Sequence, residues 1–233
     1  MVLLSVMGEA VLQAPQGRLT PAASRVFSLA LLLLLDREHP WERDELVGLV
    51  WPDASPSNGR HNLRQALYRL RMLGIPVSAT GERISLAPDV VIRSNEPLPE
   101  EPAAGMSDAI VSGTRKVGQF LGGYDPSFSP LLREWVEERR AQAHARVRVV
   151  LVQCLEHLRR AARWSELEQM STLMLEFDPL NETATLFRAE VAALSGDKVG
   201  ALRMLSEYAE EVGQVNRDIA IPAKILRRRV SEQ

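Results

Sequence analysis

Hydrophobic and polar positions in the first fifty residues predict two short strands followed by two helices. The apolar opening VLLSVMGEAVLQ is interrupted by Gly-Glu, a pattern typical of short antiparallel strands joined by a turn. A helix is predicted over residues 21–35, because Thr20 can cap its start and Pro21 fits the first helical position. Its last turns are apolar nearly all round, so we expect it to be the most buried helix of its domain. A shorter helix is predicted over residues 44–50, where Trp51-Pro52 ends it.

The pattern that follows predicts a third helix and a β-hairpin. Residues 60–73 repeat leucine at helical spacing and are followed by a glycine and a proline, which end helices. Two β-prone arms, residues 77–79 and 83–86, flank Thr-Gly-Glu, which is a hairpin signal. Strands, three helices and a hairpin in this order indicate a winged helix-turn-helix domain over residues 1–93.

The second half of the chain is predicted to be helical. Residues 94–107 are rich in Pro, Glu, Ala and Gly and lack periodicity, which indicates a linker. From Pro130 the pattern predicts one long helix and then four shorter helices that begin near Trp164, Asn181, Lys198 and Pro222. AARWSELEQMSTL aligns with LSGDKVGALRMLSEY at a spacing of 34 residues, the period of tetratricopeptide helix pairs. This favours an all-α, tetratricopeptide-like domain over residues 108–233; the alternative is an irregular helical bundle.

The helix predicted over residues 60–73 has a leucine side and a cationic side. Because a helix turns about 100° per residue, its leucines and Ala66 form one stripe, which must face the domain core. The opposite side carries polar and basic side chains, and Arg60 and Arg71 lie nearer the core boundary, from which a long side chain can reach a phosphate. The candidate DNA contacts on this helix are Arg60, His61, Arg64, Gln65, Tyr68, Arg69 and Arg71.

Arginine and glutamine on such a side can read base edges in the major groove, and peripheral arginines can neutralise phosphates. An ordinary solvated helix face is the alternative, which the helix-turn-helix before it and the hairpin after it disfavour. Arg83, just after the hairpin turn, is a further candidate for the minor groove. Its alternative role is an exposed strand residue that pairs with Glu82 or with water.

Charge and composition narrow the classes of function. The net charge of −2 argues against a uniformly basic coat, but residues 60–83 contain five basic residues and one acidic residue, a local charge of +4. The longest apolar run, residues 29–35, is too short to span a membrane. A single cysteine, Cys154, excludes an intramolecular disulfide and indicates a cytoplasmic protein, with the thiol acting as a buried small hydrophobe. No catalytic or metal-binding set is assembled by the spacing of the residues, so we expect no enzyme activity, no cofactor and no metal.

The residues around these features carry a family resemblance. LVWPDASPSNGRHNLRQALYRLR, residues 49–71, resembles the winged-helix domain of the Streptomyces antibiotic regulatory protein family. FLGGYDPSFSPLLREWVEERR, residues 120–140, and FDPLNETATLFRAEVAALSGDKVGALRMLSEY, residues 177–208, resemble the bacterial transcriptional activator domain of these regulators. The resemblance implies an OmpR-type recognition helix over residues 60–73, a wing over residues 77–86, binding to repeated half-sites and contact with RNA polymerase.

Two functional hypotheses follow. The first is a sequence-specific transcriptional activator that binds double-stranded DNA and RNA polymerase, with the helical domain serving polymerase contact or homodimerisation. The second is a tetratricopeptide-type adaptor for protein partners, in which the winged helix does not bind DNA. Large aromatic residues near the start of the long helix, Tyr124, Phe128 and Trp135, can line a partner groove or belong to the core, and their spacing beside leucines favours the core.

Overall fold

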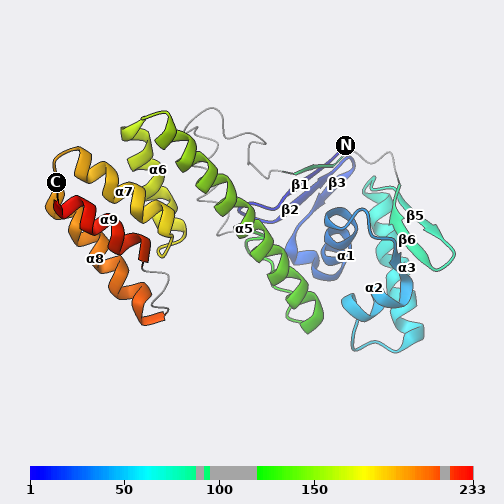
Figure 1. The fold of residues 1–233 in the computed structure, drawn as a ribbon. Coiled ribbons are helices and arrows are strands. Elements are labelled where there is room, and N and C mark those ends of the chain that lie inside the picture. The colour runs from blue at the N-terminus through cyan, green and yellow to red at the C-terminus, as the bar shows by residue number, and fades with distance from the viewer. Residues whose placement is uncertain (88–91, 95–119, 216–220, 233) are drawn as a thin grey trace. The chain divides into compact units, whose positions relative to one another are not determined.

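A computed structural model describes residues 1–87, 92–94, 120–215 and 221–232, which fall into two compact units. The first unit is a winged helix-turn-helix with small sheets, and the second unit is entirely helical over its described residues (Figure 1). The mainly α fold class predicted from the sequence is therefore confirmed. None of the helices in the described ranges combines the length and apolarity needed to cross a bilayer.

The first unit opens with a four-stranded sheet in the order β3-β2-β1-β7. Strands β1 (Val2–Ser5), β2 (Val11–Ala14) and β3 (Gly17–Leu19) are antiparallel, and β7 (Ile92–Ser94) pairs parallel to β1. Side chains that alternate along β1 and β2 bury one face of the sheet, as in Leu4 and Leu12. The antiparallel pair predicted for the opening residues is confirmed.

Three helices follow the sheet: α1 (Ser24–Leu35), α2 (Arg43–Val50) and α3 (Pro56–Met72). Every residue of α1 from Phe27 to Leu34 is buried, as its all-round apolar sequence predicts. The predicted cap at Thr20 is wrong, because the chain enters α1 through the 3₁₀ turn η1 (Pro21–Ala23) and the Thr20 side chain makes no capping bond. Helix α2 ends at the predicted residue and starts at a capping box between Glu42 and Glu45.

The wing is a three-stranded antiparallel sheet in the order β4-β6-β5. Strands β5 (Val77–Thr80) and β6 (Arg83–Leu86) form the hairpin predicted from the sequence, and β4 (Trp41–Glu42) pairs with β6. Gly81 occupies the turn with a φ of +60°, a left-handed backbone conformation that glycine adopts more readily than other residues. The hairpin contacts α3 through β5 (Figure 1).

The first unit extends beyond the predicted boundary at residue 93, since it also contains residues 120–143. The backbone of Leu121 and Gly122 bonds to Val6 and Gly8 of the N-terminal segment. The start of the long helix α5 (Pro130–Arg160) is held to α1, because Asp36 accepts a hydrogen bond from Trp135 and pairs with Arg139. The assignment of residues 108–233 to one helical domain therefore differs from the observed division, and the predicted linker lies outside the described residues apart from Ser94.

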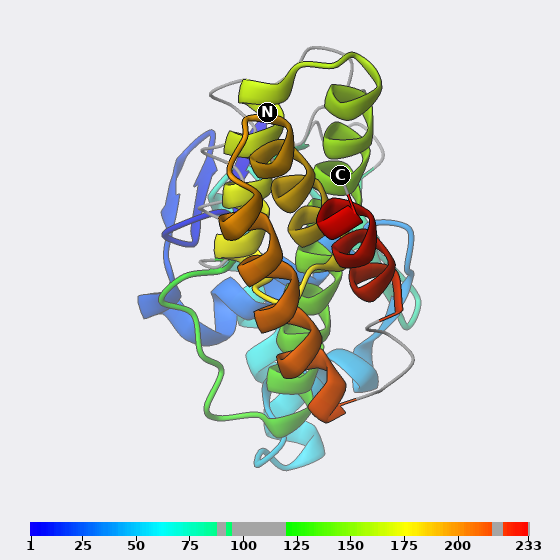
Figure 2. The ribbon, with the colours of Figure 1, turned by 60° about the vertical axis from the view of Figure 1, so that its left-hand side comes forward.

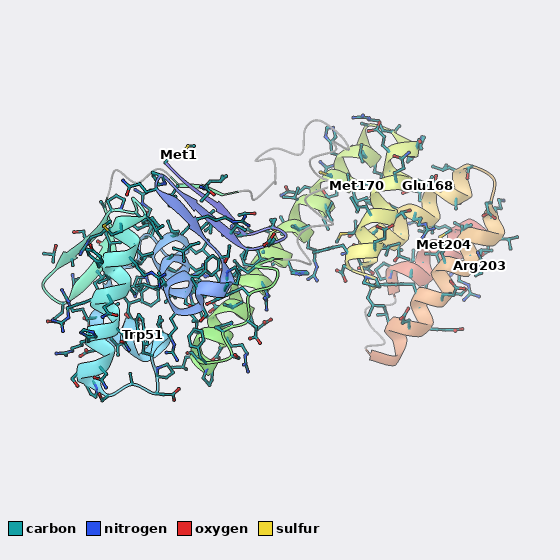
Figure 3. All side chains as sticks on the ribbon, turned by 180° about the vertical axis from the view of Figure 1, so that it is seen from behind. Met1, Trp51, Glu168, Met170, Arg203 and Met204 are labelled. Atoms are coloured by element: carbon teal, nitrogen blue, oxygen red, sulfur yellow. The ribbon has the colours of Figure 1, made fainter. Side chains whose placement is uncertain are left out.

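In its described residues, the second unit contains the C-terminal part of α5 and four further helices, each packed on the next in chain order from α6 onwards (Figure 2). These helices are α6 (Trp164–Phe177), α7 (Glu182–Leu194), α8 (Lys198–Val215) and α9 (Ile221–Glu232). Helices α6 and α8 begin 34 residues apart, the spacing expected for tetratricopeptide pairs. Met170 of α6 and Met204 of α8, labelled in Figure 3, are the matched positions of the two repeats. Met170 is fully buried and Met204 is half-buried.

Candidate nucleic-acid interface

Helix α3 begins four residues earlier than the sequence predicts. Its first helical residue is Pro56 rather than Arg60, because proline already has a helical φ and lacks only an N–H that would be unpaired in the first turn. The helix ends at Met72 with Leu73 as its C-cap, and Gly74 follows with a φ of +81°. The earlier start adds one exposed turn that includes Ser57 and Asn58.

Helix α3 separates an apolar side from a polar side. Its buried residues are Gly59, Leu63, Ala66, Leu67 and Leu70, which confirms the predicted leucine stripe. The opposite side is open to solvent, with 62% of Tyr68 and 57% of Met72 exposed. The other exposed residues on this side are His61, Arg64, Gln65 and Arg69. Core packing therefore fixes the helix while its polar side stays accessible.

Close contact with α2 sets the position of α3. A Cβ atom on Gly59 would lie 2.4 Å from Cγ1 of Val47, so only glycine permits this approach of the two helices. Gly59 and Val47 are both buried. The glycine in the loop-like sequence before the predicted helix is thus a packing residue at a helix crossing.

Two of the arginines predicted to contact DNA have partners on other elements of the protein. Arg60 donates through Nε and Nη2 to Asp44 of α2, at 3.0 Å and 2.9 Å. This bonding lowers the pKa of the Asp44 carboxyl and raises that of the Arg60 guanidinium. Arg71 donates to the carbonyl of Val77 in β5, at 3.2 Å from Nε and 3.1 Å from Nη2. Because both arginines lie at the core boundary, α2 and β5 are within their reach, and they join α3 to its neighbours instead of standing free for phosphate.

Three other predicted cations remain free of carboxylates. The side chains of Arg64, Arg69 and Arg83 are exposed and make no hydrogen bond or ion pair with any residue in the described ranges. His61 and Gln65 contact each other, since Nε2 of Gln65 lies 2.8 Å from Nε2 of His61, one turn apart. The amide can donate to the imidazole when that nitrogen carries no proton. The polar side of α3 thus presents the uncompensated positive charge of Arg64 and Arg69 around the hydrogen-bonding pair of His61 and Gln65.

The wing is held by Arg43, a residue that the sequence analysis did not single out. The backbone N–H of Arg43 donates to the carbonyl of Glu82 at 2.9 Å, and its Nε donates to the carbonyl of Gly81 at 3.0 Å. Arg43 Nε also lies 3.8 Å from the Glu82 carboxylate. This fixes the turn that precedes Arg83 relative to the start of α2.

A hollow of about 430 Å³ lies beside α3, between the start of α1 and the loop after α2. Arg25, Asn62 and Arg69 are among its lining residues, together with Trp51, which is labelled in Figure 3. Arg25 donates to the carbonyl of Val50 at 2.7 Å and lies over the ring of Phe128. Asn62 could have been found from the sequence, because it lies three residues before Gln65 on the same helix.

The remaining candidates are structural. Tyr124 is buried and Trp135 is half-buried, which confirms the preference for a core role over a partner groove. Burial raises the pKa of the Cys154 thiol, so the reactive thiolate is disfavoured there. Within the described ranges, His, Cys, Asp and Glu form no group that could hold a metal ion.

Comparison with known proteins supports the fold. No known protein family and no curated protein matches the chain in sequence. Among solved structures, the chain is similar to Mycobacterium tuberculosis EmbR, which was determined in complex with a low-affinity phosphopeptide. The two are 16% identical with a TM-score of 0.70, and the match covers 100% of this chain and 65% of the EmbR chain. At this identity the likeness concerns the fold alone.

Proposed function

We propose that the chain is a sequence-specific DNA-binding transcriptional regulator of the Streptomyces antibiotic regulatory protein type. The observation that carries the proposal is the polar side of α3, where Arg64 and Arg69 are exposed and uncompensated while the opposite side is buried. A helix presented in this way fits the major groove, where Arg and Gln bond to base edges. The shared fold with EmbR supports the arrangement of winged helix and helical unit that the family resemblance implies.

Each residue has a separate role in the proposal. Gln65 and the flanking arginines contact bases, His61 orients the Gln65 amide, and Arg83 enters the minor groove beside the wing. An arginine that bonds to a base edge also brings one positive charge among the phosphates, so Arg64, Arg69 and Arg83 count as three cations that release counterions. Log affinity is then expected to fall with log salt with a slope of about −2.7 per protomer from this unit. The helical unit serves activation through RNA polymerase, and a homodimer would occupy repeated half-sites.

Selection from random duplex DNA tests the proposal. The full chain is expected to enrich one repeated motif, and Arg64→Ala combined with Arg69→Ala is expected to abolish the enrichment. Arg133→Ala combined with Arg160→Ala is the matched control, because it removes two exposed arginines of α5. A selection that enriches no motif with the folded wild-type chain favours the second hypothesis, a protein-interaction adaptor.

A further inference from the structure

Helix α9 has a basic face that the proposed reading of DNA by α3 does not use. Residues 221–232 contain four basic residues and one acidic residue, a net charge of +3 in a chain whose total charge is −2. The helix packs on the second unit through Ala223, Leu226 and Val230. The basic residues all lie outside this contact and are exposed: Lys224, Arg227, Arg228 and Arg229.

Three of these cations, Lys224, Arg227 and Arg229, are not neutralised in the way that those of α5 are. On α5, Arg139, Arg148 and Arg159 each pair with a carboxylate of another element. By contrast, the side chains of Lys224, Arg227 and Arg229 form no hydrogen bond or ion pair with the described part of the chain. Like charges three and four residues apart destabilise a helix, so these cations lower the stability of α9 as long as no anionic partner is bound. The helix dipole favours only the cation in the last turn, which is Arg229.

The chemistry of this face fits a polyanion better than a membrane or a protein surface. The apolar side of α9 is committed to the core, so it is not free to enter a lipid surface. Ile225, which is 50% exposed, is the large hydrophobic residue among the cations. Protein interfaces centre on buried apolar and aromatic side chains and are depleted in charge. Clustered cations without such a centre instead match phosphates, whose counterions are released on binding.

We propose that the basic face of α9, formed by Lys224, Arg227, Arg228 and Arg229, is a second DNA contact that binds phosphates of duplex DNA without reading sequence. The inference rests on the proposed function for the identity of the polyanion. It adds to that function a sequence-independent part of the affinity. Because α9 belongs to the second unit, DNA then engages both units of the chain.

Salt-dependent binding of the full chain to a random-sequence duplex tests this contact. The variant carries Lys224→Gln, Arg227→Gln and Arg229→Gln. The matched control carries Arg133→Gln, Arg160→Gln and Arg203→Gln, which removes three exposed charges from other helices. Losing three phosphate contacts is expected to make the salt slope shallower by about 2 to 3. The control is expected to keep the wild-type slope, and circular dichroism checks that all three proteins retain their helical content.

A slope for the α9 variant that equals that of the control overturns the inference and directs the search to an acidic protein partner. Failure of the proposed function gives a different result. In that case the selection enriches no motif and Arg64→Ala with Arg69→Ala changes nothing, while the α9 variant still weakens binding to random duplex. If both hold, the α9 variant binds more weakly but selects the same motif as the wild-type chain.

Discussion

Replacing Tyr124 by phenylalanine tests how residues 120–143 are held to the winged helix. The Tyr124 side chain is 2% exposed and packs edge-on against Phe27, with ring centroids 5.3 Å apart. Its hydroxyl lies 2.5 Å from Oγ of Ser28 in α1, a buried hydrogen bond between residues 96 positions apart. Ser28 also donates to the carbonyl of Ser24 at 2.6 Å, which fixes the Tyr124 hydroxyl as the donor in the pair.

Because of this bonding pattern, substitutions of Tyr124 and of Ser28 are expected to lower the free energy of unfolding by different amounts. Tyr124→Phe removes one hydrogen bond but leaves Ser28 bonded to Ser24, so we expect a loss of about 1 kcal/mol in the free energy of unfolding. Ser28→Ala leaves the Tyr124 hydroxyl buried without an acceptor, so its expected cost is larger, about 1 to 3 kcal/mol. In the double variant the orphaned hydroxyl is absent, and the costs are expected to be less than additive.

Denaturant unfolding of the wild type and the three variants at neutral pH measures these costs. Three of the four tryptophans, Trp41, Trp51 and Trp135, belong to the first unit, so most of the tryptophan fluorescence reports on it. A larger loss for Tyr124→Phe than for Ser28→Ala, or strict additivity in the double variant, would refute the reasoning from the buried hydroxyl pair.

The same substitution has a pH signature. Burial raises the pKa of Tyr124 from its ordinary value of 10.0 to about 12. The folded state therefore favours the neutral phenol, and its stabilising contribution is complete below pH 10 and is lost as the pH rises toward 12. We expect the wild type to lose about 2 kcal/mol from this group by pH 12, a loss that Tyr124→Phe does not show. An unfolding free-energy difference between the two proteins that is constant from pH 8 to pH 11.5 would contradict the burial of this hydroxyl.

Two further predictions concern the packing and charge of α3. Gly59→Ala is expected to lower the free energy of unfolding by about 1 to 3 kcal/mol, because the new Cβ would lie 2.4 Å from Val47. Gly48→Ala is the control: its Cβ meets nothing within 4 Å, so it is expected to stabilise α2 by about 0.5 to 1 kcal/mol. Thermal unfolding compares the two variants, and equal effects would contradict the close crossing of α2 and α3. Asp44→Asn is expected to release Arg60, so that binding to random duplex DNA tightens and the salt slope steepens by about 1. Fluorescence anisotropy titrations at several salt concentrations measure the affinity and the slope. Unchanged binding would show that Arg60 does not reach a phosphate even when it is free.

Several elements could be predicted because local signals at both ends agree with the periodicity between them. Helix α6 begins at the predicted residue, Trp164, and Asp178-Pro179 follows its end, while the wing follows from a turn that contains Gly81. The leucine stripe of α3 is a repeat at helical spacing, so its burial follows from periodicity alone.

Contacts between residues far apart in the chain were not accessible from the sequence. Asp36 accepts from Trp135 across 99 positions and pairs with Arg139 across 103, and neither pairing leaves a local pattern. These contacts place the start of α5 with the winged helix, contrary to the boundary expected from composition. The ion pair of Arg60 could not be predicted for the same reason. The sequence placed Arg60 correctly at the core boundary of α3, but its partner Asp44 belongs to another helix.

Arg43 recognises the wing tip mainly through the main-chain carbonyls of Gly81 and Glu82, to which it donates hydrogen bonds, while its ion pair with the exposed Glu82 carboxylate is longer, at 3.8 Å. Such recognition is indifferent to which side chains the tip carries, provided that the turn keeps its backbone path. Side chains at the tip can therefore be substituted, and the charge of the tip changed, without displacing the hairpin. Substitutions in this loop that keep its backbone path are expected to be tolerated, whereas loss of the arginine at position 43 would release the turn.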